Sequence, residues 1–372
     1  MTDDPQTVDP PVIGGGAKKL LYALDTARRI GPGKAAKALT GRNTCKACAL
    51  GMGGQAGGMT NERGTFPSVC NKSVQAQSTD IQPPIAEADL RRPLADLRAT
   101  PARLLEKLGR LNTPLHKPAG GDRYAAIGWG DALDIAAARL AAVDPQRSFF
   151  YSSGRSSNEA GFLFQLIARL YGTNNVSNCS YYCHQATSVA LGETIGTGTA
   201  TVELADLDRA DLIFVVGANP ASNHPRLIHE LKACRDRGGA VIVINPAKEP
   251  GLVRFASPKS ARAMLKGGDA IASDYLQPRI GGDIWLFKGI AKAVRALGAT
   301  DDAFIGAHTD GYADYAADID ALDWPTIETG CGVPRAAIER VAARFAEARS
   351  AVFAWGMGMT HHLHGVENIE AL

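Results

Sequence analysis

The clearest hydrophobic pattern in the chain is a pair of apolar runs separated by a stretch with helical spacing. Residues 211–217 are mostly apolar and end in glycine, and residues 240–246 are a second apolar run that ends in Asn-Pro, as expected for strands buried on both faces of a sheet. Between them, Pro225 can occupy the first turn of a helix that ends at Gly238-Gly239. This strand–helix–strand unit predicts an α/β fold with doubly wound, mostly parallel sheets of the Rossmann type.

Further periodic segments lie on both sides of this unit. They predict helices over 131–143, 158–171 and 335–348, and strands over 148–152 and 351–355. Asn158 is the expected N-cap of the second of these helices. At the end of the chain, Val366, Ile369 and Leu372 begin a helical stripe that has no stop signal, so we expect the chain to be truncated.

The chain before about residue 95 has a different character. Residues 51–58 are glycine-rich and Pro83-Pro84 follows, without the periodic apolar positions of a self-sufficient core. We expect residues 1–95 to be irregular and to need a cofactor or a neighbouring domain to hold them.

Composition excludes several classes of protein. The 372 residues carry 40 Lys and Arg against 38 Asp and Glu, a net charge of +2, which argues against a nucleic-acid partner. No apolar run approaches the roughly 18 residues that a membrane span needs, so no membrane partner is expected. The seven cysteines are an odd number, which argues against a disulfide framework. We therefore expect a cytoplasmic protein whose reduced cysteines are available to metals.

One group of cysteines lies in the glycine-rich part of the chain. Cys45 and Cys48 form a Cys-x-x-Cys pair, and Cys70 follows. Such a pair can direct two thiolates at one metal, and an iron–sulfur cluster, a zinc site and a redox dithiol are the competing interpretations, with thiols of no special role as the remaining alternative. The spacing favours the cluster, because no strand precedes Cys45 as a redox dithiol requires, and no further zinc ligands follow in the usual window.

A second group combines Cys179, Cys183 and His184. The two cysteines are four positions apart and share a face if the segment is helical. A thiolate beside an imidazole can be a soft metal ligand or a nucleophile with a proton acceptor, and the alternative is that the cysteines are small core residues. Cys234 and Cys331 are expected in the core.

Two further motifs could bind ligands. The loop 217–225 follows a buried strand, where α/β sheets bind ligands, but it lacks the Gly-x-Gly-x-x-Gly fingerprint, so a nicotinamide dinucleotide is disfavoured. The helix beginning near Pro225 could direct N–H groups at a phosphate. The spacing of His361, His362 and His364 resembles that of a metal site. A simpler interpretation is that these side chains are solvated or hydrogen-bonded.

In combination these motifs resemble the prokaryotic molybdopterin-containing oxidoreductases, in particular the cytoplasmic branch similar to the formate dehydrogenase alpha subunit. The likeness extends from about residue 15 to the last residue. It rests on residues 45–55, 152–159, 172–176, 179–184, 217–225, 245–246, 278–286 and 356–360.

The resemblance implies molybdenum held by bis-(molybdopterin guanine dinucleotide). Cys183 falls where the family places the metal-ligating cysteine or selenocysteine, and His184 matches the adjacent histidine that handles protons. Six residues fall in segments that look like cofactor-contacting loops: Gly217, Asn219, His224, Asn245, Asp283 and Gly358.

The resemblance also implies a [4Fe-4S] cluster near the pterin. Cys45, Cys48 and Cys70 match its ligands, and Lys72 matches the lysine between cluster and pterin. Met52 stands where many relatives have another cysteine, so the fourth ligand is unknown.

The implied division of the chain has three parts. Residues 1–95 resemble the iron–sulfur segment, 96–178 the first half of an α/β pterin-binding domain, and 179–372 the α/β domain that binds molybdopterin guanine dinucleotide. The implied function is two-electron oxidation or reduction of a small-molecule substrate at molybdenum, with electrons passing through the cluster to a partner protein. The alternative is a truncated, non-catalytic α/β binding protein with a zinc or iron–sulfur knot.

Overall fold

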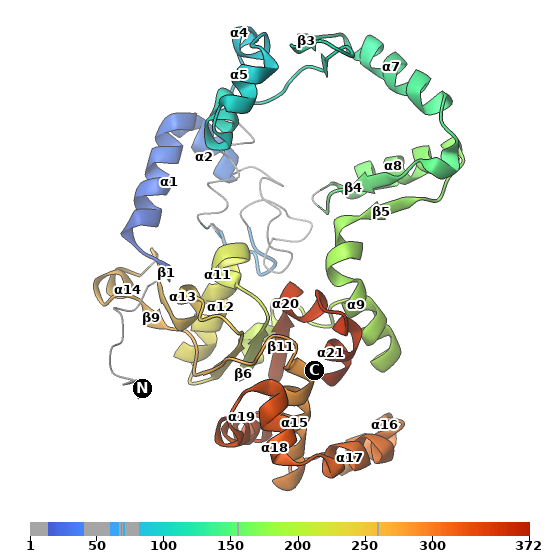
Figure 1. Cartoon of the computed structure of the whole chain (residues 1–372). Coiled ribbons are helices and arrows are strands. Elements are labelled where there is room, and N and C mark those ends of the chain that lie inside the picture. The colour runs from blue at the N-terminus through green and yellow to red at the C-terminus, as the bar shows by residue number, and fades with distance from the viewer. Residues whose placement is uncertain are drawn as a thin grey trace, which may run out of the picture.

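A four-stranded parallel sheet forms the centre of the molecule (Figure 1). The computed structural model describes residues 14–40, 60–66, 68, 70, 82–154, 156–258 and 260–372, with side chains described for all of these except 38–40. The strand order is β10-β7-β6-β11. The strands are β6 Leu212–Val216, β7 Ala240–Ile244, β10 Asp274–Leu276 and β11 Ala351–Trp355. The central pair β6 and β7 is joined through a helix, which confirms the predicted doubly wound α/β fold.

Helices cover both faces of this sheet. The helices from residue 179 onward are α9 Cys179–Thr194, α10 Asp206–Arg209, α11 Pro220–Asn223, α12 Pro225–Asp236, α13 Pro250–Val253, α14 Ala261–Leu265, α15 Asp283–Ala296, α16 Asp302–His308, α17 Tyr312–Ala321, α18 Trp324–Cys331, α19 Arg335–Glu347, α20 Met357–Thr360 and α21 Gly365–Ala371. A small sheet at the side of the body has the order β1-β8-β9, formed by Gly14–Gly15, Arg254–Ala256 and Asp269–Ala270.

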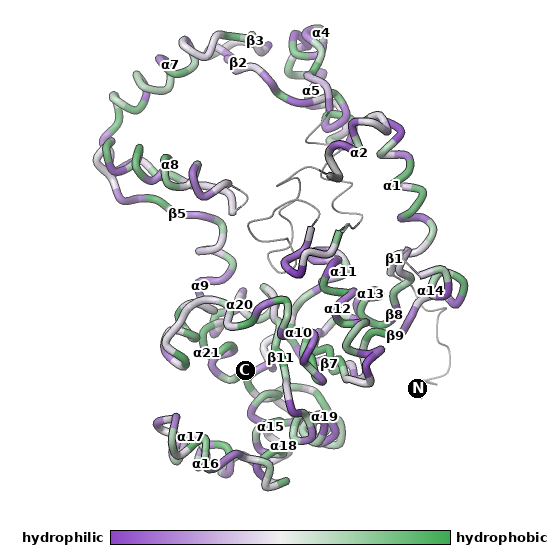
Figure 2. Tube along the Cα trace, turned by 180° about the vertical axis from the view of Figure 1, so that it is seen from behind, coloured by the Kyte–Doolittle hydropathy of each residue, from purple (hydrophilic) through white to green (hydrophobic). Residues whose placement is uncertain are grey.

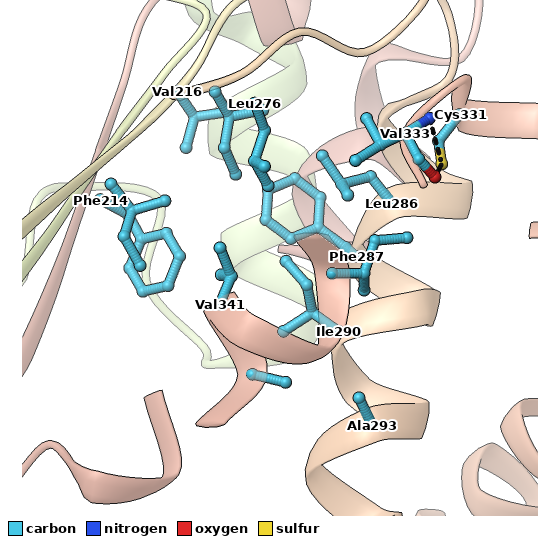
Figure 3. Close-up of a cluster of buried hydrophobic side chains, with 14 of the residues drawn as sticks. Phe214, Val216, Leu276, Leu286, Phe287, Ile290, Ala293, Cys331, Val333 and Val341 are labelled. Carbon is cyan, nitrogen blue, oxygen red and sulfur yellow. Dashed lines mark hydrogen bonds between the residues drawn. The ribbon is translucent and has the colours of Figure 1, made fainter. Parts of the chain in front are cut away.

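Side chains that alternate along β6 divide between two hydrophobic clusters. Leu212, Phe214 and Val216 pack in the cluster with α15, α18 and α19, part of which Figure 3 shows, while Ile213 and Val215 pack in the cluster with α12. Successive strand residues point to opposite faces, so a strand that is apolar at every position requires a cover on both sides. Each such side chain contributes about 1.5–3 kcal/mol on burial.

The two cysteines expected in the core are found there. Cys234 of α12 and Cys331 at the end of α18 are both fully buried. The Cys331 sulfur accepts the N–H of Val333 at 3.4 Å (Figure 3). These two thiols are structural residues.

The predicted helices and strands outside this unit are also present, with ends that differ by a few residues. They are α7 Trp129–Ala141, α8 Asn158–Tyr171, α19, β4 Phe150–Ser152 and β11. The expected N-cap of α8 is wrong by one position: the Ser157 hydroxyl accepts the N–H of Ala160 at 3.2 Å, and Asn158 is already the first helical residue.

The expectation of an irregular N-terminal segment is wrong for residues 17–40. These residues form α1 Ala17–Ile30 and α2 Pro32–Thr40. Residues 17–30 contain neither glycine nor proline, and Gly16 and Gly31 with positive φ mark the two ends of α1. Helical propensity between these two breakers therefore outweighed the glycine-rich surroundings.

Residues 82–178 form an arch that leads away from the central sheet and returns to it at α9 (Figures 1 and 2). Its elements are α4 Glu87–Leu90, α5 Leu94–Ala99, α6 Ala102–Leu105, η2 Glu106–Leu108, β2 Leu115–His116, β3 Ala125–Ala126, α7, η3 Pro145–Arg147, β4, α8 and β5 Val176–Asn178. Several large apolar side chains on the arch are exposed, including Trp129 (69%), Phe162 (65%) and Leu170 (80%). The parallel pair β4–β5 thus has apolar neighbours that no described part of the chain covers.

Across the described part of the chain, none of the helices has both the length and the apolar character that crossing a membrane would require.

Candidate active site

Cys183 ends a short helical turn of its own. α9 begins after Asn178, whose side-chain oxygen accepts two backbone N–H groups of the turn, at 2.9 and 3.3 Å. The helix bends at His184, where φ is −135° and ψ is 19°. Cys179 and Cys183 therefore lie together in the turn that precedes the bend, as their spacing predicted.

Two side chains from the loop after β11 hold the end of this turn. The Thr360 hydroxyl donates to the carbonyl oxygen of Cys183 at 2.6 Å. Nε2 of His361 donates to the carbonyl oxygen of Tyr182 at 3.1 Å. A bend in a helix leaves carbonyl groups to be satisfied by other donors, and here these donors come from a neighbouring strand end.

The Cys183 thiol is partly exposed and is not sealed among aliphatic side chains. Its sulfur lies 3.8 Å from the carbonyl oxygen of Ser180. Loss of hydration raises the pKa of Cys183, and the nearby Cys179 adds to this effect. A bound cation would reverse the effect, since coordination favours the thiolate.

The His184 ring is oriented by a chain of two hydrogen bonds. The indole N–H of Trp355 donates to the Thr187 hydroxyl at 3.0 Å, and the same hydroxyl lies 3.3 Å from Nδ1 of His184. Because the hydroxyl oxygen already accepts the indole N–H, its own proton is free to point at Nδ1, which favours the tautomer protonated on Nε2. Burial lowers the pKa of His184 and the neighbouring His361 lowers it further, so the ring is held neutral.

A cavity of about 1120 Å³ lies beside α9, α12 and the end of β11. His184 and His224 both line it, together with Arg226 and residues of the segments 61–68 and 200–207. Partial loss of hydration lowers the pKa of His224, and the nearby His184 lowers it further. The fold thus brings together two of the predicted site residues, and the space beside them is large enough for a sizeable ligand.

Gly217 and Gly358 form a backbone cradle at the ends of β6 and β11. The N–H of Gly358 donates to the carbonyl oxygen of Gly217 at 3.0 Å. A Cβ atom on Gly358 would lie 2.6 Å from that oxygen, and one on Gly217, whose φ is +55°, would lie 2.9 Å from Gly358 backbone atoms. Only glycine allows the two loops to approach this closely.

Asn219 and Asn245 shape the neighbouring loops. Asn219 caps α11 by accepting the N–H of Ser222 at 3.2 Å and donates to the Glu249 carboxylate. The buried Asn245 donates to the carbonyl oxygen of Ala218 at 3.3 Å. Both side chains therefore link the loop after β6 to the loop after β7, at the edge where parallel sheets bind ligands.

Asp283 lies in the first turn of α15 and is 8% exposed. Burial raises its pKa, and the nearby His362 and His364 counter the rise. This carboxyl faces the histidines of the loop after β11.

Two of the three histidines of that loop make hydrogen bonds to backbone carbonyl groups. His362 Nε2 donates to the carbonyl oxygen of Gly358 at 2.8 Å, and His361 holds Tyr182 as described above. Among the residues that the structure describes, no group of three or more His, Cys, Asp or Glu side chains could hold a metal ion.

Three predicted site residues, Cys45, Cys48 and Lys72, lie outside the described residues. Cys70 is described and is partly buried. The cluster prediction therefore stays a prediction.

Sequence reasoning missed the residues that hold the turn of Cys183. Thr360 lay in a matched motif, but its partner is 177 positions away, and Thr187 and Trp355 join across 168 positions. No local pattern marks these pairs.

Residues 110–372 match the protein family described as molybdopterin oxidoreductase. The chain belongs to this family.

Relatives with similar sequences come from different bacteria. Protein YdeP of Escherichia coli is 41% identical over 280 residues, which cover 72% of this chain and 37% of YdeP. The uncharacterized oxidoreductase Rv2900c of Mycobacterium tuberculosis is 37% identical, covering 76% of this chain and 37% of its own. Formate dehydrogenase H of Escherichia coli is 29% identical, and the match covers 71% of this chain and 35% of that enzyme. The chain therefore spans little more than a third of the length of these relatives.

A solved structure supports the fold. Acetylene hydratase from Pelobacter acetylenicus superposes with a TM-score of 0.56 at 20% identity, covering 70% of this chain and 34% of that chain.

The residues of this family member fit part of a molybdopterin cofactor. The carboxyl edge of the sheet, where Gly217 and Gly358 bring two loops together, carries amide and carboxyl side chains. Cys183 offers the soft thiolate that molybdenum accepts.

Proposed function

We propose that this chain is the part of a molybdopterin-dependent oxidoreductase that binds a guanine dinucleotide form of the cofactor and supplies the protein ligand to molybdenum. The observation that carries the proposal is the partly exposed Cys183 thiol at a bend braced by Thr360. The family match makes an oxidoreductase the expected class.

In this proposal the cofactor, when bound, supplies the two-electron chemistry, and the protein supplies binding, orientation and proton handling. Cys183 would hold the metal. His184, neutral and protonated on Nε2, can take up a proton at Nδ1, the atom that faces the Thr187 hydroxyl, when substrate is oxidised.

The nucleotide part of the cofactor would lie along the strand ends. Gly217 and Gly358 would keep the two loops close together beside the nucleotide, and Asn219, Asn245 and Asp283 would meet the polar edge of the guanine or ribose. His224 would face the ligand from the cavity wall.

The finer parts of the proposal concern electrons, substrate and domains. We propose a [4Fe-4S] cluster on Cys45, Cys48 and Cys70, an electron-transfer partner protein, a small-molecule substrate similar to formate, and a cytoplasmic location. The division at residues 95 and 178 is part of the same proposal. The exposed apolar side chains of the arch support a domain that further polypeptide completes.

The test is the metal and pterin content of the complete gene product after purification without oxygen. We expect molybdenum or tungsten together with pterin, and we expect Cys183→Ala to lose the metal while its circular dichroism spectrum is unchanged. Ser180→Ala, in the same turn, is the matched control and should keep the metal. Wild-type protein that contains neither metal would overturn the proposal and favour a non-catalytic binding protein.

A further inference from the structure

Cys179 lies in the same turn as Cys183, and the proposed function gives it no role. It opens α9, one helical turn before Cys183. Its sulfur accepts the backbone N–H of Gly154 at 3.0 Å, and a Cβ on Gly154 would lie 2.8 Å from that sulfur. The thiol is partly exposed, as is that of Cys183.

We propose that Cys179 and Cys183 form a modification site in which peroxide closes a disulfide between them when Cys183 holds no metal. The buried thiols Cys234 and Cys331 take no part, because neither is accessible to peroxide.

The geometry of the turn permits the bond. Helical residues four positions apart have Cα atoms about 6.2 Å apart, inside the range of roughly 4.4–6.8 Å found for disulfides. Their Cβ atoms are about 5–6 Å apart, whereas a disulfide needs about 3.5–4.5 Å, so the turn must tighten by about 1–2 Å. The non-helical backbone at His184 separates this turn from the rest of α9, so the tightening does not have to propagate along the helix.

Exposure supports the pairing, because both thiols are partly accessible to a small oxidant. Tyr181 and Tyr182, between them in sequence, are both exposed, so the turn can tighten by moving Cys179 while Thr360 and His361 hold its other end.

The reaction balances with peroxide as the oxidant. One thiolate attacks a peroxide oxygen and breaks the O–O bond, which gives a sulfenic acid and hydroxide. The second thiolate then attacks the sulfenic sulfur and releases a second hydroxide, and the two protons that the thiols lost convert both hydroxides to water. Two thiols are oxidised by two electrons, and one hydrogen peroxide is reduced to two waters.

The chain offers a direct readout of this bond. No lysine or arginine lies between Arg169 and Arg209, so trypsin releases residues 170–209 as one peptide that contains Cys179 and Cys183 and no other cysteine. The reduced 372-residue chain is treated with hydrogen peroxide, then with iodoacetamide, and digested. We expect this peptide without alkyl groups and two hydrogen masses lighter, and we expect dithiothreitol to restore alkylation of both thiols.

Matched variants decide the pairing. Neither Cys179→Ser nor Cys183→Ser can form this disulfide. In each variant the remaining thiol should either stay open to alkylation or gain oxygen as a sulfinic acid. A wild-type peptide that gains oxygen in the same way as the Cys179→Ser peptide would overturn the inference. So would a cross-link from Cys183 to the peptide that contains Cys70.

This result is independent of the proposed function. A disulfide in a protein that never binds molybdenum leaves the inference standing and the proposed function contradicted. A protein that binds molybdenum but whose metal-free form shows no disulfide supports the proposed function and contradicts the inference.

Discussion

The Thr360 hydroxyl donates a hydrogen bond of 2.6 Å to the carbonyl oxygen of Cys183, joining residues that are 177 positions apart. Thr360 is 8% exposed, so this bond is shielded from water. It ties the end of the turn that presents the thiol to the loop after β11. The position of the candidate metal ligand therefore depends on a strand end that is remote in sequence.

Replacing Thr360 by valine should loosen this turn. The change keeps the side-chain shape but removes the donor and leaves the Cys183 carbonyl unpaired, which should lower the free energy of unfolding by about 1–2 kcal/mol. Urea denaturation followed by circular dichroism measures the loss. Thr360→Ser retains the hydroxyl and should recover most of the stability; a Thr360→Val variant as stable as the wild type would show that the hydrogen bond does not matter.

Replacing Gly358 by alanine should separate the loops after β6 and β11. The new Cβ would meet the Gly217 carbonyl oxygen at 2.6 Å, and backbone cannot yield as a flexible side chain does. We expect a loss of about 1–3 kcal/mol and weaker binding of guanosine diphosphate. Calorimetry measures both quantities.

Gly306→Ala is the control for that change. Gly306 lies within α16, and its Cβ would meet nothing within 4 Å. Alanine there should stabilise the protein by about 0.5–1 kcal/mol, because glycine is the poorer helix former. If Gly358→Ala behaves like this control, the two loops do not require their close contact.

Replacing Asp283 by asparagine should stabilise the protein near neutral pH. Burial raises the pKa of Asp283 above its unfolded value, so the ionised carboxylate costs stability in full above the raised pKa. The cost disappears as the pH falls through that pKa towards the unfolded value of about 3.9. The stabilisation in Asp283→Asn, followed by thermal unfolding across pH, should therefore shrink on acidification; a pH-independent difference would contradict it.

Replacing His224 by glutamine should reduce the sensitivity of the fold to acid. Its pKa is lowered in the folded state, so the neutral ring contributes stability above the unfolded pKa of about 6.5. That stability is lost as the pH falls through the lowered folded pKa. Wild type should lose more stability than His224→Gln between about pH 7.5 and 5.5, and parallel unfolding curves would show that His224 does not contribute.

The sequence predicted the central sheet because its signal is local. The apolar runs at 211–217 and 240–246 could only be strands covered on both faces, and Pro225 with Gly238-Gly239 set the limits of the helix between them. The helix at residues 17–30 was missed because the glycine-rich stretches around it indicate irregular structure, although the segment itself contains no breaker.

The sequence alone determined the parallel α/β sheet and the family likeness, and it singled out Cys183 and His184 as candidate site residues. Each of these follows from residues close together in the chain, whose spacing is fixed by helix and strand geometry. Only the tertiary structure decided that Thr360 and His361 brace that turn, that Gly217 and Gly358 meet backbone to backbone, and that His224 shares a cavity with His184. These contacts arise where the ends of parallel strands converge, and the packing of the sheet, not the order of residues, sets which ends meet.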